Sequence, residues 1–414
     1  MAEDTASGRR VGVRVTPAGL RAVRGGEPWL FDGSITSATP PDLPSGSVAI
    51  VFDDRRRVAG VGLWDPDSPI RVKMLHGGGS VTVDAAFWLT RLRAALERRR
   101  SLIDDPDTTA WRWVHGENDG LPGLVVDRYA DTLVIKCYTA AWVPHLDDVL
   151  AALVDLGAPE RIVIRHSRRI GEAFPYADGE TVRGAAPTGP VVFRERGLTM
   201  AADVVSGHKT GHFLDQRDNR ALVRSAAEGC RVLDVFSATG GFALAAAAGG
   251  ATSVHLVDVS QPALDTAMAN LARNRHISGV AACDVATTRG DAFAVLERFA
   301  ADGREYDLVI LDPPSFAQNA ASVPNALEAY ERLARLGIRL TAEGGTLVQA
   351  SCSSRVDVDQ LAEALRLATR GTGRRVRERR RTAHPIDHPI GFAQGGYLKA
   401  LYVEVAASVA GTKN

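Results

Sequence analysis

The sequence predicts an α/β protein whose largest domain is built on a doubly wound, mainly parallel sheet. The first indication is a succession of strand, glycine turn, helix and strand over residues 232–258. The second is an apolar strand over residues 306–311 that ends in an Asp-Pro-Pro turn, and the third is a strand over 345–350 that ends at Ser351 and Cys352. Because ligands of open α/β sheets gather at the carboxyl ends of the strands, these endings predict one functional edge.

The glycine turn predicts a nucleotide-type pocket, since Gly240 and Gly241 allow the backbone to approach a ligand closely. The turn contains neither Gly-x-Gly-x-x-Gly nor Gly-Lys-Ser/Thr, so it lacks the usual cradle of a dinucleotide or a nucleoside triphosphate. An adenosine with a zwitterionic tail fits better, and S-adenosylmethionine is such a ligand. Asp258, at the tip of the second strand, is expected to bind both ribose hydroxyls.

The other predicted cofactor contacts surround this turn. Arg217 lies at a junction between a loop and a helix, where it is expected to pair with the carboxylate of the methionine tail. Asp291, at the end of the third strand, is expected to accept the exocyclic amine of adenine. The predicted cofactor-binding residues are Gln216, Arg217, Asp234, Phe236, Ser237, Thr239, Gly240, Asp258, Asp291 and Asp312.

The Asp-Pro-Pro turn predicts a substrate that is a planar nitrogenous base. Its two prolines fix the backbone behind Asp312, and a flipped base could stack on Phe316 while its edge bonds to Asp312. The plain alternative is a rigid turn that only ends a strand. The predicted substrate-binding residues are Pro313, Pro314, Ser315 and Phe316.

Cys352 is the candidate nucleophile. A lone cysteine at a strand end is usually a small hydrophobe, but the neighbouring Asp312 turn favours a chemical role. Carbon 5 of a pyrimidine is a poor nucleophile, and a thiolate that adds to carbon 6 converts the ring into an enamine whose carbon 5 can attack a methyl sulfonium. A nearby cation would activate the thiol. Asp312 and Cys352 are therefore the predicted catalytic residues.

Together these motifs resemble the large-subunit ribosomal RNA cytosine-5 methyltransferases. The resemblance covers nearly the whole chain, and its motifs are residues 209–217, 236–241, 312–316, 351–353, 387–389 and 396–399. It implies a Rossmann-like class I methyltransferase domain, S-adenosylmethionine as cofactor, structured ribosomal RNA as substrate and Cys352 as nucleophile. Ser315 departs from the family, which often has lysine after the two prolines, so the group that removes the carbon 5 proton is open.

The 414 residues are predicted to form three domains. Short strands separated by turns indicate a small β domain over residues 8–78, which the resemblance makes PUA-like and RNA-binding. Residues 79–190 are predicted to form a central α/β domain that closes with a loop and linker over 171–190. Residues 191–414 are predicted to form the methyltransferase domain.

Two features of the first half are predicted to be structural. Trp29 and Phe31 follow a turn in the β domain, where aromatic side chains usually belong to the core. Glu117 and Asp119 lie in a glycine-punctuated polar loop, so solvated turn acids are the expected interpretation.

Composition limits the cellular context. The formal net charge is zero, but basic runs recur and the densest spans residues 374–381; a solvated face is the ordinary interpretation of any single run. Four scattered cysteines without a Cys-x-x-Cys pair indicate a reducing compartment, which predicts a cytoplasmic protein. No apolar run reaches the roughly 18 residues of a membrane span, so neither a span nor a signal peptide is expected.

Metal binding is not expected, because Pro385 and Pro389 prevent the helix that would align His384 and His388. A homodimer is compatible with the sequence. Three other functions are compatible as well: a guanine-amine or uracil-5 methyltransferase on the same fold, a ribosome-assembly factor that binds RNA and uses the cofactor only for stability, and, with weaker support, a methyltransferase of small molecules.

Overall fold

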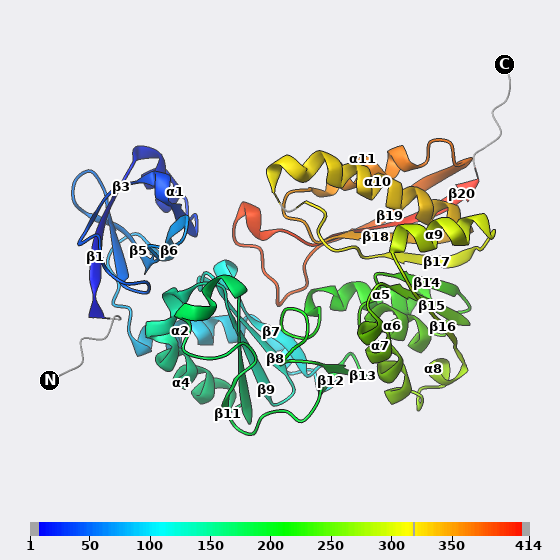
Figure 1. Ribbon diagram of the computed structural model, residues 1–414, viewed down its shortest axis with the longest axis horizontal. Helices are drawn as coiled ribbons and strands as arrows, with labels where there is room; N and C mark the ends of the chain where they lie inside the picture. Colours follow the sequence, from blue (N-terminus) through cyan, green and yellow to red (C-terminus); the bar gives the residue numbers. More distant parts are fainter. Residues whose placement is uncertain (1–7, 318, 408–414) are drawn as a thin grey trace, which may run out of the picture. The chain divides into compact units, whose positions relative to one another are not determined.

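A computed structural model describes residues 8–317 and 319–407, and these fold into two compact units (Figure 1). The first unit comprises residues 8–194, 202–214 and 386–395, and the second comprises residues 195–201, 215–385 and 396–407. The chain passes from the first unit to the second around β12 (Val191–Glu195) and β13 (Leu198–Ala202).

The first unit begins with a six-stranded sheet in the order β2-β6-β5-β4-β1-β3. Its strands are β1 (Arg10–Val15), β2 (Trp29–Phe31), β3 (Ile35–Thr39), β4 (Val48–Phe52), β5 (Val58–Trp64) and β6 (Ile70–Gly77). Alternating apolar residues such as Val11 and Val13 are fully buried in its core.

One helix of this β domain escapes the sequence prediction. Helix α1 (Pro17–Arg24) begins with Thr16, whose hydroxyl accepts the backbone N–H of Gly19, and Pro17 occupies its first turn. Eight residues are too short to show a clear helical period among strands. The expectation that Phe31 is core is also wrong, since 50% of Phe31 is exposed.

The central part of the first unit is a five-stranded sheet in the order β11-β10-β9-β8-β7, covered by helices. Its elements are α2 (Ala85–Glu97), α3 (Arg100–Ile103), β7 (Ala110–His115), β8 (Leu124–Tyr129), β9 (Thr132–Cys137), α4 (Leu146–Gly157), β10 (Arg161–His166) and β11 (Thr181–Arg183). Strand β11 lies inside the segment predicted as loop and linker. Strand β11 pairs with β10 over only a few residues, too few to show a periodic pattern of apolar residues in the sequence.

Asp119 is not the solvated acid that its loop predicts. Its carboxylate receives two hydrogen bonds from the Arg99 guanidinium at 2.8 and 2.7 Å, and both side chains are fully buried. The backbone N–H of His115 donates to the same carboxylate at 2.7 Å. The partner lies 20 residues earlier, so local turn composition carries no sign of it. Glu117 accepts a hydrogen bond from Trp29 Nε1 at 2.9 Å.

The second unit contains a seven-stranded sheet in the order β16-β15-β14-β17-β18-β20-β19. The strands are β14 (Arg231–Val235), β15 (Ser253–Asp258), β16 (Asp284–Arg289), β17 (Tyr306–Leu311), β18 (Thr341–Ser351), β19 (Arg374–Thr382) and β20 (Lys399–Ala407). All are parallel except β20, which is antiparallel to both β18 and β19. The chain order reverses between β14 and β17, which is the topological switch point.

Helices cover this sheet on both faces (Figure 1). Helices α5 (Arg217–Ala226), α6 (Gly241–Ala248) and α7 (Gln261–Arg273) lie on one face, and α9 (Ala292–Ala301), α10 (Val323–Leu340) and α11 (Val358–Ala368) lie on the other. The short helix α8 (Ser278–Ala282) precedes β16. A large buried cluster joins the central strands to α9, α10 and α11.

None of the four cysteines forms a disulfide bond. Within residues 8–317 and 319–407, no helix has both the length and the apolar character required to cross a bilayer. The same part of the chain contains no grouping of three or more His, Cys, Asp and Glu side chains suited to a metal ion.

Candidate active site

The turn after β14 has an unusual backbone. Phe236 and Ala238 have φ angles of 62° and 47°, in the left-handed region that favours glycine, and Gly240 has a φ of 76°. Such conformations at residues with a side chain cost free energy and cluster at functional sites. Asp258 holds this turn, because its Oδ2 accepts the N–H of Ala238 at 2.9 Å while its Oδ1 accepts the N–H of Ser260 at 2.9 Å.

The two glycines of the turn have no space for a side chain. A Cβ on Gly240 would lie 2.6 Å from the Cβ of Ala267, and one on Gly241 would lie 2.9 Å from Cδ of Arg220. The turn therefore packs directly against α7 and α5, and its predicted close approach to a ligand stays a prediction.

Asp234 is fully buried beneath the turn. Its Oδ2 accepts the N–H of Ala243 at 3.0 Å, at the start of α6. Burial raises the pKa of Asp234 to about 7; the Ala243 N–H opposes this shift, and the nearby Asp312 and Asp258 carboxylates reinforce it. Three carboxylates thus meet at the switch point, which is suited to a cationic ligand.

Asp312 lies at the end of β17 and is held from α5. Gln216 Nε2 donates to Asp312 Oδ1 at 2.9 Å, and Asn219 Nδ2 donates to Gln216 Oε1 at 2.6 Å. Arg217, at the first position of α5, is only 1% exposed. The structure therefore brings Gln216 and Asp312 together with Asn219, and Arg217 directly follows Gln216; their contacts with the cofactor stay predictions.

Cys352 follows β18 and meets the Asp-Pro-Pro turn. Its Sγ lies 3.9 Å from the carbonyl oxygen of Pro313. Cys352 is partly exposed, so its thiol is accessible to a reactant. The two strand endings that the sequence predicts at one edge are thus in contact.

Lys399 is the functional candidate that the sequence does not single out. It is 6% exposed, lies opposite Ser351 in the β18–β20 pairing, and its ammonium donates to the backbone carbonyls of Ser353 and Val356. Burial lowers the pKa of Lys399 to about 8, and the Cys352 and Asp357 side chains oppose this shift. The only sequence signal is a lysine that opens a mainly apolar strand.

The remaining predicted contacts lie around this edge. Phe316 packs on Tyr330 and Phe293, with ring centroids 4.9 and 6.4 Å apart. The Ser315 hydroxyl donates to the carbonyl of Ala317 at 3.4 Å. Asp291 is exposed and caps α9, since its Oδ1 accepts the N–H of Ala294 at 3.0 Å. Its contact with adenine stays a prediction.

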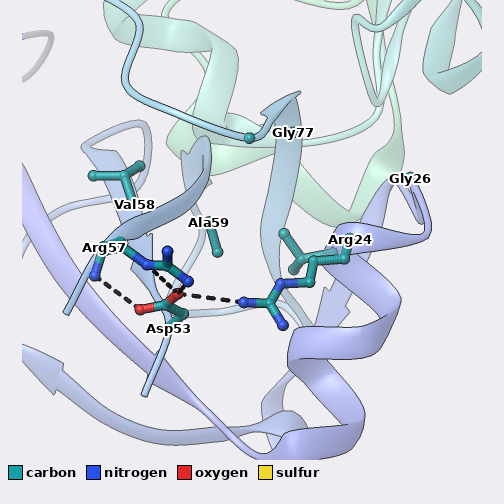
Figure 2. Close-up of a pocket in the computed structure, with 9 residues that line it drawn as sticks. Arg24, Gly26, Asp53, Arg57, Val58, Ala59 and Gly77 are labelled. Atoms are coloured by element: carbon teal, nitrogen blue, oxygen red, sulfur yellow. Dashed lines mark hydrogen bonds and ion pairs between the residues drawn. The ribbon is translucent and has the colours of Figure 1, made fainter. Parts of the chain in front are cut away.

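A separate basic pocket of about 550 Å³ lies in the β domain, between the end of α1 and the β4–β5 turn (Figure 2). Asp53 sits between the guanidinium groups of Arg24 and Arg57, whose side chains are 55% and 67% exposed. The N–H groups of Arg57 and Arg55 also donate to Asp53, and the Arg57 N–H is the main reason that the pKa of Asp53 lies below its usual range. Two cations therefore share one carboxylate at the rim.

Comparison with known proteins identifies the family. The model of the S-adenosylmethionine-dependent methyltransferases matches residues 151–387, and a PUA-like domain model matches residues 13–76. The chain belongs to the S-adenosylmethionine-dependent methyltransferases. It is 42% identical to a ribosomal RNA large subunit methyltransferase of Deinococcus radiodurans, over 98% of this chain and 100% of that protein. It is 35% identical to the ribosomal RNA large subunit methyltransferase I of Shewanella amazonensis, over 95% and 99% of the two chains.

Solved structures confirm the fold. A Streptococcus mutans protein described as a SAM-dependent methyltransferase superposes with a TM-score of 0.80, at 20% identity, over 95% of this chain and 99% of its own. A methyltransferase crystallised with SAH also has a TM-score of 0.80, at 19% identity, over 96% and 100% of the two chains. The predictions of a Rossmann-like methyltransferase domain, a PUA-like domain and S-adenosylmethionine as cofactor are confirmed.

The residues of this methyltransferase fit the cofactor on structural grounds. The turn over 236–240 combines left-handed φ angles with a glycine that has no space for a side chain. Among the described residues, the buried Asp234 Oδ1 and Ser237 Oγ have no hydrogen-bond partner, and a buried polar atom without a partner is costly unless a ligand or water supplies one. The three carboxylates favour the positive charge of a sulfonium or ammonium group.

Proposed function

We propose that this protein methylates carbon 5 of a cytosine in large-subunit ribosomal RNA, with Cys352 as the covalent nucleophile. The observation that carries the proposal is the 3.9 Å approach of the Cys352 thiol to the Pro313 carbonyl, which joins a thiol to an Asp-Pro-Pro turn at one sheet edge. Methylation of a ring nitrogen or an exocyclic amine needs no thiol, whereas methylation of carbon 5 does. The names of the relatives from Deinococcus radiodurans and Shewanella amazonensis support large-subunit ribosomal RNA as the substrate.

The proposed reaction uses the chain's own groups for binding and covalent catalysis. Asp312, fixed by Gln216, orients the flipped base while the Cys352 thiolate forms a bond to carbon 6. S-adenosylmethionine, when bound, supplies the methyl group that carbon 5 of the resulting enamine takes up. Loss of the carbon 5 proton to a base then restores the 5,6 double bond and expels the thiolate, so that Cys352 is regenerated.

The Lys399 side chain supports this role for Cys352 as a positioning residue. Its ammonium holds the carbonyls of Ser353 and Val356, so it fixes the turn that carries the thiol. It also provides a buried positive charge near a thiolate, which stabilises the ionised form.

RNA binding and catalysis are assigned to different parts of the chain. We assign RNA contact to the PUA-like domain, where Arg24 and Arg57 line an open basic pocket, and chemistry to the second unit. Such contacts to phosphates fix orientation but carry no base specificity.

The test is trapping of an adduct. Large-subunit ribosomal RNA that contains 5-fluorocytosine cannot lose the carbon 5 substituent, so a Cys352 adduct should accumulate and be found by peptide mass spectrometry. Cys352→Ala should lose methyl transfer by several orders of magnitude, whereas Cys283→Ala, a control at a partly buried thiol, should retain it. Full transfer by Cys352→Ala would refute the covalent mechanism.

Two other functions are separated by the same material. Nucleoside mass spectrometry of the modified RNA distinguishes 5-methylcytosine from 5-methyluracil and from methylated guanine. Tight RNA binding without any methyl transfer in a single turnover would instead support a ribosome-assembly factor.

A further inference from the structure

Strand β19 at the edge of the methyltransferase sheet carries six arginines, and the strand register sorts them by face. Residues that lie opposite one another in antiparallel strands point to the same face. Arg375, Arg377 and Arg380 lie opposite Ala406, Glu404 and Tyr402 of β20. These three arginines therefore share one face of the sheet, which we call the arginine face.

A β-bulge keeps this arrangement. The register shifts between Glu378 and Arg380, so Arg379 is the extra residue of β19. Without the bulge, Arg380 would point to the opposite face from Arg377. The bulge places Arg380 on the arginine face and so continues the row begun by Arg375 and Arg377.

The other face of β19 reaches the core at Val376 and also carries Arg374, Glu378 and Arg381. Val376 packs against the buried cluster that contains Leu401 and Val403 of β20. The arginines outside the row have carboxylate partners: Arg374 pairs with Glu305, Arg379 with Glu404, and Arg381 with Glu378 and Asp359.

The three arginines of the row have no such ion pairs, and the one carboxylate opposite them on β20, Glu404, is paired with Arg379. Arg375, Arg377 and Arg380 are exposed, and none of them has an ion pair with any carboxylate in residues 8–317 and 319–407. Three exposed positive charges about 6–7 Å apart along a strand form a linear array, the pattern expected for a polyanion backbone.

The row points to the reaction site. Thr382, two residues beyond Arg380, donates from its hydroxyl to Asn219 Oδ1 at 2.7 Å, and Asn219 bonds Gln216, which bonds Asp312. In the same sheet, Thr382 lies opposite Ala400, next to Lys399. The carboxyl end of the arginine face thus lies at the sheet edge that carries Asp312 and Cys352.

We propose that the arginine face binds the phosphate backbone of the substrate RNA beside the target nucleotide. The inference rests on the proposed function, because it takes RNA as the substrate. The face supplies the charge complement of a nucleic acid strand and leads it to the carboxyl edge of the sheet. Charged side chains also protect edge strands from pairing with other chains, and the experiment must separate that role.

The experiment measures RNA affinity against salt concentration with the full chain. The probe is a fluorescently labelled large-subunit ribosomal RNA transcript, and the variant is the triple change Arg375→Gln, Arg377→Gln and Arg380→Gln. Each lost phosphate contact lowers the slope of log affinity against log salt by about 0.7–0.9, so a decrease of about 2 to 3 is expected. Affinity at low salt should fall at least about tenfold.

The matched control removes the same charge from paired, exposed arginines of the same unit, Arg231→Gln, Arg332→Gln and Arg366→Gln. It should leave slope and affinity close to those of the wild type. Equal salt slopes for the β19 variant and the wild type would overturn the inference. Self-association of the β19 variant in light scattering, together with an unchanged RNA affinity, would also overturn it.

Failure of the proposed function gives a different result. A wild-type protein that binds no ribosomal RNA removes both proposals. If the wild type binds RNA and the triple β19 variant shows the predicted decrease in salt slope, but no Cys352 adduct forms, the proposal for the arginine face stands and the covalent mechanism is rejected.

Discussion

Lys399 shows how a single buried side chain can set the pH response of a site. Its pKa of about 8 lies below the ordinary value of 10.5, so the ammonium loses its proton as the pH rises through about 8 in the folded protein. The charge that stabilises a Cys352 thiolate is therefore present below pH 8 and lost above it.

Substitution of Lys399 tests this coupling. Lys399→Met should slow alkylation of Cys352 by iodoacetamide at pH 7 by about tenfold or more, since each pKa unit of thiolate stabilisation is a factor of ten in thiolate fraction. Lys399→Arg should keep the charge and shift to higher pH any decline in methyl transfer that begins near pH 8. The measurement is peptide mass spectrometry of labelled Cys352 against pH.

Cys283 is the internal control in each sample, because it is a partly buried thiol on a different strand end. A Lys399→Met protein in which Cys352 and Cys283 both react as in the wild type would show that Lys399 has no influence on the thiol. Rescue by arginine but not methionine would identify charge, rather than packing, as its contribution.

At the same scale, Asp258, Asp312 and Cys352 are candidates from the sequence because each lies at the carboxyl end of a predicted strand. Lys399 could not be predicted in this way. It lies 47 positions after Cys352, and only the antiparallel register of β20 places it opposite Ser351. The prediction of a solvated Asp119 was wrong for a related reason, since its partner Arg99 is distant in sequence.

At the scale of elements, the junction of β14 and α6 contains a carboxylate that is costly to ionise. Asp234 has a pKa of about 7 in the folded protein against an ordinary value of 3.8, so the folded state binds more protons between these pH values. Stability should therefore fall as the pH rises from about 4 to 7.

Asp234→Asn removes this dependence. Asparagine can still accept the Ala243 N–H. The unfolding free energy of the variant minus that of the wild type should therefore be larger at pH 8 than at pH 5, by on the order of 2 kcal/mol. Urea denaturation at the two pH values measures it. The control is Asp284→Asn at an exposed acid on β16, which should give the same difference at both values. Equal effects of Asp234→Asn at pH 5 and 8 would contradict the prediction.

Elements with a strong period were predictable, and short ones were not. Strand β17 coincides with the predicted residues 306–311, since its apolar run is bounded by turns. Helix α1 and strand β11 have eight and three residues, so their identity depends on capping and pairing rather than on a period.

At the scale of the whole molecule, the division into domains at residues 8–78, 79–190 and 191–414 stays a prediction. The structure resolves two units, and residues 386–395 belong with the first although they follow most of the second. Boundaries predicted from a sequence divide the chain into consecutive segments, whereas a compact unit can include a segment from later in the chain. Asn118, for example, accepts the N–H of Gly391 within the first unit.

The two proposed RNA surfaces lie in different units, which makes a quantitative prediction. Arg24→Gln with Arg57→Gln should weaken binding of large-subunit ribosomal RNA and reduce the salt slope by about 1.4 to 1.8, because two phosphate contacts are lost. Asp53 keeps the backbone N–H donors of Arg55 and Arg57, so the pocket should remain folded, which the melting temperature checks.

Combining this pair with the triple change at Arg375, Arg377 and Arg380 should add the two losses of binding free energy. Changes at sites without shared partners usually add, and the two sets of arginines, which belong to different units, share no carboxylate in the described chain. Fluorescence anisotropy at several salt concentrations gives both terms. If the combined variant binds RNA with the same affinity as the weaker-binding of its two component variants, the RNA contacts only one surface at a time. Simple addition requires that a single RNA molecule contact the PUA-like domain and the methyltransferase sheet together.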